Sequence, residues 1–425
     1  MKIKTLSLRN FRSAENLHLE FHGTMNVFLG ANGSGKSTIQ DAIAVMLSWA
    51  VNRLKHAGAS GRPITESDIT NGTSASSIQI DCIDDEQNII WKLVKRRKGH
   101  VSLKKKSDFS ALSNYTKQQR LFITNEKEKL NLPLFVYYPV HRAVLDIPLR
   151  IRKRHSFNLF AAFDEALTSG GNFRTFFEWF REREDLENEN RKYVNALFQP
   201  DDFQFPDPQL EAVRNALEQF LPQFKHLSVR RNPLRMEVEK DGKNLSVNQL
   251  SDGEKCLIAL IGDLARRIAI VNPVRENPLD GEGVVLIDEI DLHLHPKWQR
   301  IIVPTLTSVF PNIQFIISTH SPHVVTHVKP ENIFLLTQSD QGIISDSPIE
   351  SYGKNVDRVL EDLMGLETTR PDKVNHKLTE LFESISKGKL DKAREQLGIL
   401  QSMIGEDSAL VKASVLIKRQ EIIGK

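Results

Sequence analysis

The sequence predicts an α/β fold: a sheet with covered faces built from two parts of the chain, a helical insertion between them, and a helical C-terminal region. Two observations indicate this class. Short apolar runs that end in glycine or in acids alternate with segments of helical spacing in both sheet-forming parts. Between those parts, apolar positions recur at helical spacing and prolines interrupt them. The predicted regions are residues 1–145, 146–226, 227–346 and 347–425.

The composition is that of an ordinary globular protein. Of 425 residues, 26% are charged and 40% hydrophobic, and the net charge of +3 neither requires nucleic acid nor excludes a local basic groove. Cys82 and Cys256 are the only cysteines, too few for a disulfide framework, which favours a reducing compartment. No apolar stretch approaches the roughly 20 residues that span a bilayer. We therefore expect a cytoplasmic protein that does not contact the membrane.

The first region contains strand signals around one helix. Residues 2–9 and 17–21 alternate polar and apolar side chains, as half-buried strands do. Residues 25–29 form a short apolar run that ends at Gly30, and residues 38–51 have helical spacing. We expect further strands at residues 77–83, 89–94 and 134–138, the first two as a hairpin.

The third region repeats this alternation. Strand signals return at about residue 227, and residues 250–271 have the spacing of an amphipathic helix. Buried strands are expected at residues 284–288, 314–318 and 333–336, with a helix at residues 296–310. After about residue 350 the chain is predicted to be mostly helical and highly charged.

The segment between the predicted strand at 25–29 and the helix after it matches the P-loop pattern Gly-x-x-x-x-Gly-Lys-Ser at residues 30–37. Such a loop lets backbone N–H groups close on phosphates, and the following helix offers its positive end. Lys36 would neutralise the β- and γ-phosphates of ATP, and the Ser37 hydroxyl would coordinate Mg²⁺. The predicted nucleotide-binding residues here are Asn32, Gly33, Ser34, Gly35, Lys36, Ser37 and Thr38.

Two acids follow the apolar strand at 284–287. Asp288 would hold the magnesium shell at the carboxyl edge of the sheet, and Glu289 would act as the general base toward water. His320 follows the next buried strand and could sense the γ-phosphate or orient the water, although a histidine at a strand end can also be structural. The predicted catalytic residues are therefore Glu289 and His320.

The segment Leu250-Ser251-Asp252-Gly253-Glu254-Lys255 opens a helix, so Ser251 and the backbone at Gly253 lie at its positive end. A P-loop surrounds its own phosphates from one side only. We expect the helix end of a second protomer to cover the open side, which gives two composite sites across a twofold axis. Ser251 and Glu254 also fit an ordinary capping box, and both roles can hold together.

Together these motifs resemble the ATP-binding-cassette ATPases, and within them the SMC- and RecF-like heads used in DNA maintenance and phage defence. The resemblance implies a P-loop ABC-type ATPase head that uses ATP and Mg²⁺. It implies that Arg12, in Asn-Phe-Arg-Ser at residues 10–13, contacts nucleotide phosphate. It also implies that Ser251 and Gly253 belong to the signature motif and that Asp291 is the D-loop acid that crosses the dimer. The compact insertion replaces the long coiled coil of SMC proteins.

Residues 137–142 (Tyr-Tyr-Pro-Val-His-Arg) and the compact insertion are similar to PtuA, the ATPase family of the Septu antiphage system, which is also found beside some retrons. This similarity implies a homodimer or higher homo-oligomer that holds an HNH nuclease subunit, PtuB, and whose nucleotide state restrains or releases DNA cleavage. The glutamine of the Q-loop is not evident, because residues 138–142 occupy its place.

Two other functions remain open from the sequence. A DNA-repair or recombination ATPase of the RecF/SMC type would act on DNA directly, through the basic clusters at residues 95–98, 104–106 and 150–154, which otherwise form a solvated rim. An ATP-binding subunit of a transporter is disfavoured by the insertion and by the lack of a membrane segment.

The last region carries no compact cluster of strand-end acids, so we expect no nuclease activity in this chain. Its amphipathic stretches either pack on the ATPase core or form a docking surface for a partner. His293 and His295 alternate beside acids, but we predict no transition-metal site there because the same segment already accounts for magnesium and the base.

Overall fold

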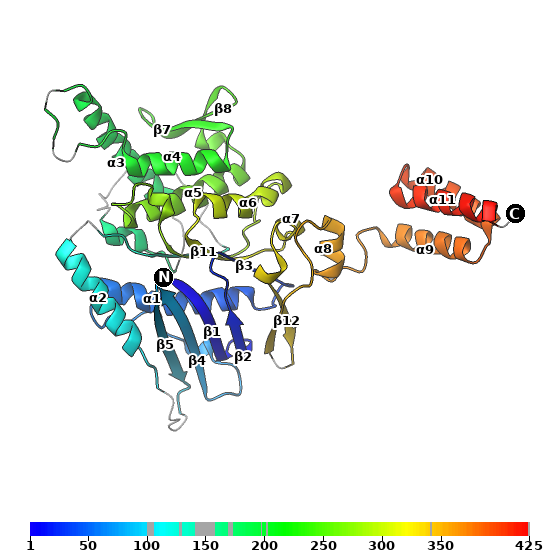
Figure 1. The fold of residues 1–425 in the computed structure, drawn as a ribbon, viewed down its shortest axis with the longest axis horizontal. Helices are drawn as coiled ribbons and strands as arrows, with labels where there is room; N and C mark the ends of the chain where they lie inside the picture. The colour runs from blue at the N-terminus through cyan, green and yellow to red at the C-terminus, as the bar shows by residue number, and fades with distance from the viewer. Residues whose placement is uncertain are drawn as a thin grey trace. The chain divides into compact units, whose positions relative to one another are not determined.

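The computed structural model describes residues 1–99, 106–126, 130–140, 158–168, 173–196, 198–200, 203–340 and 342–423. The chain forms two compact units, Met1–Lys354 and Asn355–Lys425, drawn in Figure 1. The boundary lies eight residues after the predicted start of the C-terminal region at residue 347. Every predicted site residue lies in the first unit.

A six-stranded sheet organises the first unit, in the order β13-β12-β3-β11-β10-β6. Its strands are β3 (Met25–Leu29), β6 (Leu134–Tyr138), β10 (Gly283–Ile287), β11 (Ile313–Ser318), β12 (Ile333–Ser339) and β13 (Gly342–Asp346). All neighbours pair in parallel except β12 and β13. The strands β3, β11, β10 and β6 are buried along their whole length, which explains their continuous apolar sequences. The strands expected at residues 25–29 and 134–138 are confirmed to the residue.

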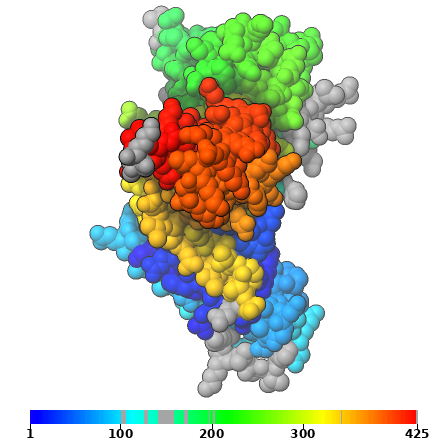
Figure 2. Space-filling view, turned by 90° about the vertical axis from the view of Figure 1, so that its right-hand side faces the viewer, coloured from blue at the N-terminus to red at the C-terminus, as the bar shows by residue number. Residues whose placement is uncertain are grey.

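A second, antiparallel sheet has the order β2-β1-β4-β5. It consists of β1 (Lys2–Phe11), β2 (Ala14–Glu20), β4 (Ala75–Asp84) and β5 (Gln87–Arg96). The polar and apolar alternation expected for residues 2–9 corresponds to a buried and an exposed face of β1. Strand β13 packs against β2, and Figure 2 shows these yellow and blue segments side by side.

Helix α1 (Lys36–Lys55) follows β3 and contacts strands of both sheets. Gln40 fixes its position, because the buried side-chain amide donates to the carbonyls of Ile287 and Ile316, at 3.0 and 3.1 Å. These acceptors belong to β10 and β11, so one helix residue ties the P-loop helix to the two strands that lead to the acidic and histidine motifs.

The remaining helices of this unit are α2 (Ser110–Glu126), α3 (Phe173–Asn190), α4 (Pro208–Phe220), α5 (Asp252–Val271), α6 (Pro296–Val309) and α7 (Pro322–Val325). Short 3₁₀ helices occur at Glu66–Asp68, Leu159–Phe163, Arg191–Tyr193, Val247–Gln249, Pro278–Asp280 and Pro330–Asn332. No helix of the described residues is both long and apolar enough to cross a bilayer.

The region between the sheet-forming parts contains α3 and α4, followed by a three-stranded sheet of β7 (Phe224–Arg231), β8 (Leu234–Lys240) and β9 (Lys243–Ser246). Helix α2 precedes that region and was not expected from the sequence. The helical insertion predicted at residues 146–226 therefore leads directly into a β-meander before helix α5.

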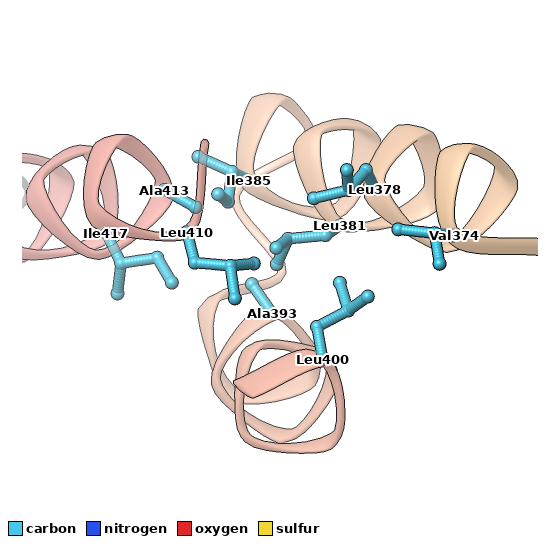
Figure 3. Packing of buried hydrophobic residues seen from close by; sticks show 9 residues of the cluster. All are labelled: Val374, Leu378, Leu381, Ile385, Ala393, Leu400, Leu410, Ala413 and Ile417. Atoms are coloured by element: carbon cyan, nitrogen blue, oxygen red, sulfur yellow. The ribbon is translucent and has the colours of Figure 1, made fainter. Parts of the chain in front are cut away.

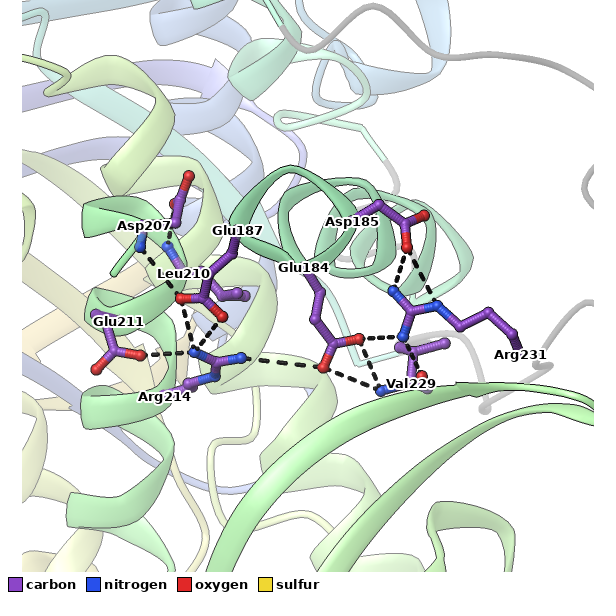
Figure 4. A network of polar contacts seen from close by, with 9 residues as sticks. All are labelled: Glu184, Asp185, Glu187, Asp207, Leu210, Glu211, Arg214, Val229 and Arg231. Carbon is purple, nitrogen blue, oxygen red and sulfur yellow. Dashed lines mark hydrogen bonds and ion pairs between the residues drawn. The ribbon is translucent and has the colours of Figure 1, made fainter. Parts of the chain in front are cut away.

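Buried carboxylates join the helices of the insertion to this meander (Figure 4). Glu184 of α3 accepts the backbone N–H of Val229 at 3.1 Å and an ion pair from Arg231 at 2.5 Å. Glu187, one turn later, pairs with Arg214 of α4 at 3.1 Å. Because a buried carboxylate left unpaired is costly, these contacts fix how α3, α4 and β7 pack together.

The C-terminal unit contains α8 (Val356–Asp362), α9 (Asp372–Ser386), α10 (Leu390–Ile404) and α11 (Ser408–Ile423). Figure 3 shows apolar side chains of α9, α10 and α11 meeting in one cluster. The cluster consists of Val374, Leu378, Leu381, Ile385, Ala393, Leu400, Leu410, Ala413 and Ile417. These helices therefore have a hydrophobic core of their own.

Candidate ATP site at the carboxyl edge of the parallel sheet

The strands that lead to the three predicted motifs are neighbours in the sheet. β3 enters the P-loop, β11 leads to His320 and β10 leads to Asp288, and they are adjacent in the order β3-β11-β10. Since parallel strands end at the same edge, the topology brings segments almost 300 residues apart in sequence together at that edge.

The P-loop backbone requires glycine at two positions. Gly33 and Gly35 have φ angles of 81° and 100°, which glycine adopts readily and other residues rarely do. At Gly35 there is also no space, because a Cβ atom would lie 2.1 Å from Cδ1 of Ile343. Asn32 and Gly33 are exposed at the tip of the loop, and Thr38 lies in the first turn of α1.

Lys36 folds back over the loop. Its Nζ atom donates to the carbonyls of Gly30 at 2.8 Å and Ala31 at 2.9 Å. Burial lowers the pKa of Lys36, and the nearby acids, with Asp288 the first among them, oppose that shift. The buried hydroxyl of Ser34 has no hydrogen-bond partner in the described structure. The loop thus holds an ammonium group and an unused hydroxyl, which fits a phosphate-binding cradle.

Ser37 and Asp288 meet across the sheet edge. The Ser37 hydroxyl donates to Oδ2 of Asp288 at 2.6 Å, so the two groups predicted to share a magnesium ion are in contact. Ser318, which the sequence analysis did not single out, also contacts Asp288. Its hydroxyl donates to Oδ1 of Asp288 at 2.5 Å and accepts the N–H of Glu289 at 2.8 Å. A hydroxyl and a carboxylate are hard oxygen ligands of the kind Mg²⁺ takes.

Glu289 has an unusual backbone conformation. Its φ angle is 46°, in the left-handed region that residues other than glycine rarely occupy. The hydrogen bond from its N–H to Ser318 helps to hold this conformation. Strained residues of this kind cluster at functional sites, because they aim a side chain where regular structure would not. Glu289 is half-buried at the site edge, and its role as a general base stays a prediction.

Asp291 and His320 lie in one hydrogen-bonded loop. The Thr319 hydroxyl donates to Oδ1 of Asp291 at 2.5 Å, and the backbone N–H of His320 donates to the same oxygen at 3.3 Å. Asp291 therefore orients the histidine loop within its own subunit. Its predicted contact across a dimer and the catalytic role of His320 stay predictions.

Arg12 is held at the end of β1 by two carboxylates. It pairs with Asp41 of α1 at 2.5 Å and with Asp68 at 2.8 Å, and Asp41 also pairs with Arg62 at 2.7 Å. Although burial alone would raise the pKa of Asp68, hydrogen bonds from Thr65 and the charge of Arg12 hold that pKa below its usual range. A phosphate contact by Arg12 would require its guanidinium to exchange a carboxylate for the nucleotide.

Tyr137 lies in the segment where a Q-loop glutamine was sought, close to Asp288 and Asp41. Its pKa is raised, first by burial and then by the charges of Asp288 and Asp41. Its neighbour Tyr138 points elsewhere, because its hydroxyl donates to Asp263 of α5 at 3.0 Å. Residues 141 and 142 of the same motif lie outside the described residues.

The predicted signature segment opens α5 with an exposed tip. Ser251 is the N-cap: its side chain accepts the N–H of Glu254 at 3.4 Å and donates to that residue's carboxylate at 2.9 Å. Gly253 is buried, and a Cβ atom there would lie 2.6 Å from the carbonyl of His293. The predicted capping box is confirmed, and Ser251 remains at the surface of this subunit.

The other polar candidates have local partners. His295 is the N-cap of α6, since its Nδ1 atom accepts the N–H of Lys297 at 3.2 Å. In the basic cluster at 95–98, Arg97 donates to backbone carbonyls, that of Ile69 included, and Lys95 faces Glu66 at 3.7 Å. Lys104, Lys105 and the cluster at residues 150–154 lie outside the described residues.

Comparison with known proteins identifies the family. A family model described as "AAA domain, putative AbiEii toxin, Type IV TA system" matches residues 25–326. The chain belongs to this family of ATPases. The matched range begins with β3 and extends beyond His320, so it includes the P-loop, the acidic motif and the histidine loop.

Three relatives carry the names of retron and Septu proteins. The "Retron Ec83 probable ATPase" of Escherichia coli is 30% identical over 99% of this chain and 87% of its own length. The "Retron Vc95 probable ATPase" of Vibrio cholerae is 31% identical over 85% of this chain and 78% of its own length. "Septu protein PtuA" of Bacillus thuringiensis is 24% identical over 96% of each chain. The predicted P-loop ATPase head and the similarity to PtuA and retron ATPases are confirmed.

Proposed function

We propose that this protein hydrolyses ATP with Mg²⁺, closes as a dimer around the nucleotide, and in doing so controls a separate HNH nuclease in antiphage defence. The observation that carries the proposal is the contact of Ser37 with Asp288, with Glu289 next in sequence and Lys36 in the same loop. These groups belong to segments that only the folded sheet brings together, and they match the donors that phosphoryl transfer requires.

Each residue has a stated part. Lys36 would leave the carbonyls of Gly30 and Ala31 for the phosphates, and the backbone N–H groups of residues 33–38 would face the same anion. Ser37 and Asp288 would hold Mg²⁺, which supplies charge neutralisation at the phosphates when bound. Glu289 would accept a proton from the attacking water, and His320 would orient that water or the γ-phosphate. Ser318 keeps Asp288 and Glu289 in place.

Dimerisation completes the site in this proposal. Ser251, Gly253 and Asp291 would contact the nucleotide of the opposite protomer. The exposed position of Ser251 supports this role, since the bonds of its hydroxyl to described residues all lie within its own helix cap. On ATP binding, the hydroxyl would exchange Glu254 for a phosphate oxygen, so closure would depend on ATP rather than on the protein surfaces alone.

Nuclease control is the part that needs a partner. The similarity to PtuA and to retron ATPases supports an HNH subunit of the PtuB type, and the four helices of Asn355–Lys425 are the proposed docking region.

The test is to express the chain with the HNH protein encoded beside it and to follow plasmid cleavage with ATP, ADP and a non-hydrolysable analogue. We expect co-purification and cleavage that depends on the nucleotide. Cleavage by the ATPase chain alone, retained in Lys36→Ala and free of contaminating nuclease, would contradict the proposal.

The alternative is a repair ATPase of the RecF/SMC type that acts on DNA without a partner. It requires ATP-dependent DNA binding by the isolated chain. It also requires this binding to fall as the basic side chains at residues 95–98 and 104–106 are removed. The pairing of Arg97 with backbone carbonyls gives that residue a structural role instead, which favours the first proposal over this one.

A further inference from the structure

Two loops of the candidate site are joined to each other at two places. The acidic loop, residues 288–295, follows β10 and carries the proposed base, and the histidine loop, residues 319–321, follows β11. The side chain of Asp291 makes the first connection, which is described above. The second connection runs through Gln299, a residue of α6 that none of the predicted motifs contains.

Gln299 uses both ends of its side-chain amide. Its Nε2 atom donates to the carbonyl of Leu294 in the acidic loop at 2.8 Å and lies 3.5 Å from the carbonyl of Asp291. Its Oε1 atom accepts the hydroxyl of Ser321 in the histidine loop, also at 2.8 Å. The Ser321 oxygen accepts in turn the N–H of His323 at 3.1 Å. Because a carbonyl can only accept, Leu294 fixes the orientation of the amide.

This bridge requires a side chain that donates at one end and accepts at the other. Ser321 and Leu294 are both buried residues. A glutamine amide satisfies the hydroxyl and the carbonyl at once, whereas an apolar side chain of similar length would satisfy neither. The two hydrogen bonds therefore hold the acidic loop and the start of α6 to the histidine loop.

His320 lies between the two connections. Thr319, the residue before it, donates to Asp291 at 2.5 Å, and Ser321, the residue after it, donates to Gln299. The backbone N–H of His320 also donates to Asp291. Within the part of the chain that the structure describes, its imidazole ring makes no hydrogen bond, so the backbone on either side determines where the ring stands.

We propose that Gln299 is a positioning residue for His320 and keeps the imidazole ring in a fixed place relative to Glu289. The inference rests on the proposed function, in which Glu289 accepts a proton from the attacking water and His320 orients that water or the γ-phosphate. These two groups belong to different loops, so their separation depends on how the loops are joined. Misplacement of a reacting group by about 1 Å can cost about 10²-fold in rate.

The first test is the effect of Gln299→Met on ATP hydrolysis. Methionine is similar in length but makes neither hydrogen bond. We expect kcat to fall by about tenfold and KM for ATP to change by less than about twofold, because the bridge contacts the two loops and not the P-loop. Gln219→Met, at an exposed glutamine of α4, is the matched control and should hydrolyse ATP as the wild type does.

A second background separates positioning from a general structural role. If Gln299 acts through His320, Gln299→Met should lower kcat in the wild type but leave the residual rate of His320→Ala almost unchanged. Ser321→Ala breaks the bridge from the other loop and replaces Gln299→Met if that variant does not fold. Equal fold losses in the two backgrounds, or a wild-type kcat in Gln299→Met, would overturn the proposal.

A readout without hydrolysis keeps the bridge separate from the proposed function. Hydrogen exchange of the free protein reports on the amides of His320, Ser321 and His323, which are all hydrogen-bonded. We expect Gln299→Met to speed their exchange severalfold and Gln219→Met to leave it unchanged. Unchanged exchange in Gln299→Met would contradict the bridge whether or not the protein hydrolyses ATP. Faster exchange together with a wild type that does not hydrolyse ATP would instead remove the proposed function, and the positioning role with it.

Discussion

The P-loop side and the signature side of the proposed composite site differ in how many of their groups are held in place by contacts within one subunit. On the P-loop side, hydrogen bonds between segments distant in sequence join Ser37, Asp288 and Ser318, and Lys36 folds back over its own loop. On the signature side, Ser251 is exposed, and among the described residues its hydroxyl is hydrogen-bonded to Glu254 of its own helix cap. In the proposed dimer, one chain would therefore preorganise the groups that bind ATP, while the groups that sense a bound ATP would be completed by a second chain.

The largest effect should come from the base on the preorganised side. Glu289→Gln removes the proton acceptor but preserves the size and shape of the side chain, so ATP binding should remain while turnover falls by about 10²–10⁴-fold. Phosphate release under saturating ATP measures this loss. Glu331→Gln changes an exposed glutamate in the 3₁₀ helix before β12, serves as the control and should turn over normally. Equal rates in the two variants would remove Glu289 from the chemistry.

A smaller effect is expected from the lysine of the P-loop. Lys36→Ala removes the ammonium group that would face the phosphates, and nucleotide affinity should fall by about a hundredfold or more. A fluorescent ATP analogue in an equilibrium titration measures the affinity. The hydrogen bonds that are lost go to two carbonyls of the same loop and not to the sheet, so the variant should still fold. Unchanged affinity would show that the phosphates bind elsewhere.

Ser318→Ala should have an intermediate effect on turnover alone. The hydroxyl positions Asp288 and the N–H of Glu289 without belonging to the phosphate-binding groups, so its loss should lower kcat by about tenfold with little change in ATP affinity. Steady-state kinetics of ATP hydrolysis gives kcat and KM separately and so measures both effects. A rise in KM at constant kcat would mean that Ser318 acts in binding instead.

The smallest effect on ATPase activity is expected in the C-terminal unit. Leu381→Ala removes a fully buried side chain and should destabilise the α9–α11 helices by about 2–5 kcal/mol, with little change in turnover. Hydrogen exchange of the amides of α9 measures the loss. Val415→Ala, at a position 59% exposed on α11, should leave exchange almost unchanged. Loss of ATPase activity in Leu381→Ala would tie this unit to the catalytic head.

The sequence predicted best what depends on short-range pattern. Strands β3 and β6 were located to the residue, since a strand buried on both faces is a short apolar run between turn residues. Helix α2 was missed, because its sequence is rich in polar residues and its apolar spacing is weak. β13 was missed as well, because it is a five-residue edge strand in which Ile343 is buried, Ile344 is exposed and the last two residues are polar.

At the candidate site, the sequence motifs predicted which residues are involved. Their hydrogen-bond partners became evident only from the order of the strands in the sheet. Nothing in the local sequence of Ser318 shows that it contacts Asp288, because that contact follows from the pairing of β10 with β11. The same holds for Asp41, which joins Arg12 to Arg62 through the packing of α1. Side-chain partners that lie far apart in sequence are set by topology, which periodicity and spacing do not encode.

The central claim, that two protomers share each ATP, is tested most directly by measuring molecular mass by light scattering with and without ATP. The samples are Glu289→Gln, which should bind ATP without hydrolysing it, and the same protein carrying Ser251→Arg. Ser408→Arg, an exposed serine at the start of α11, is the matched control. We expect ATP to increase the mass of Glu289→Gln and of the control. The Ser251→Arg protein should bind ATP but keep its mass. An equal ATP-driven increase in the Ser251→Arg protein would contradict the composite site.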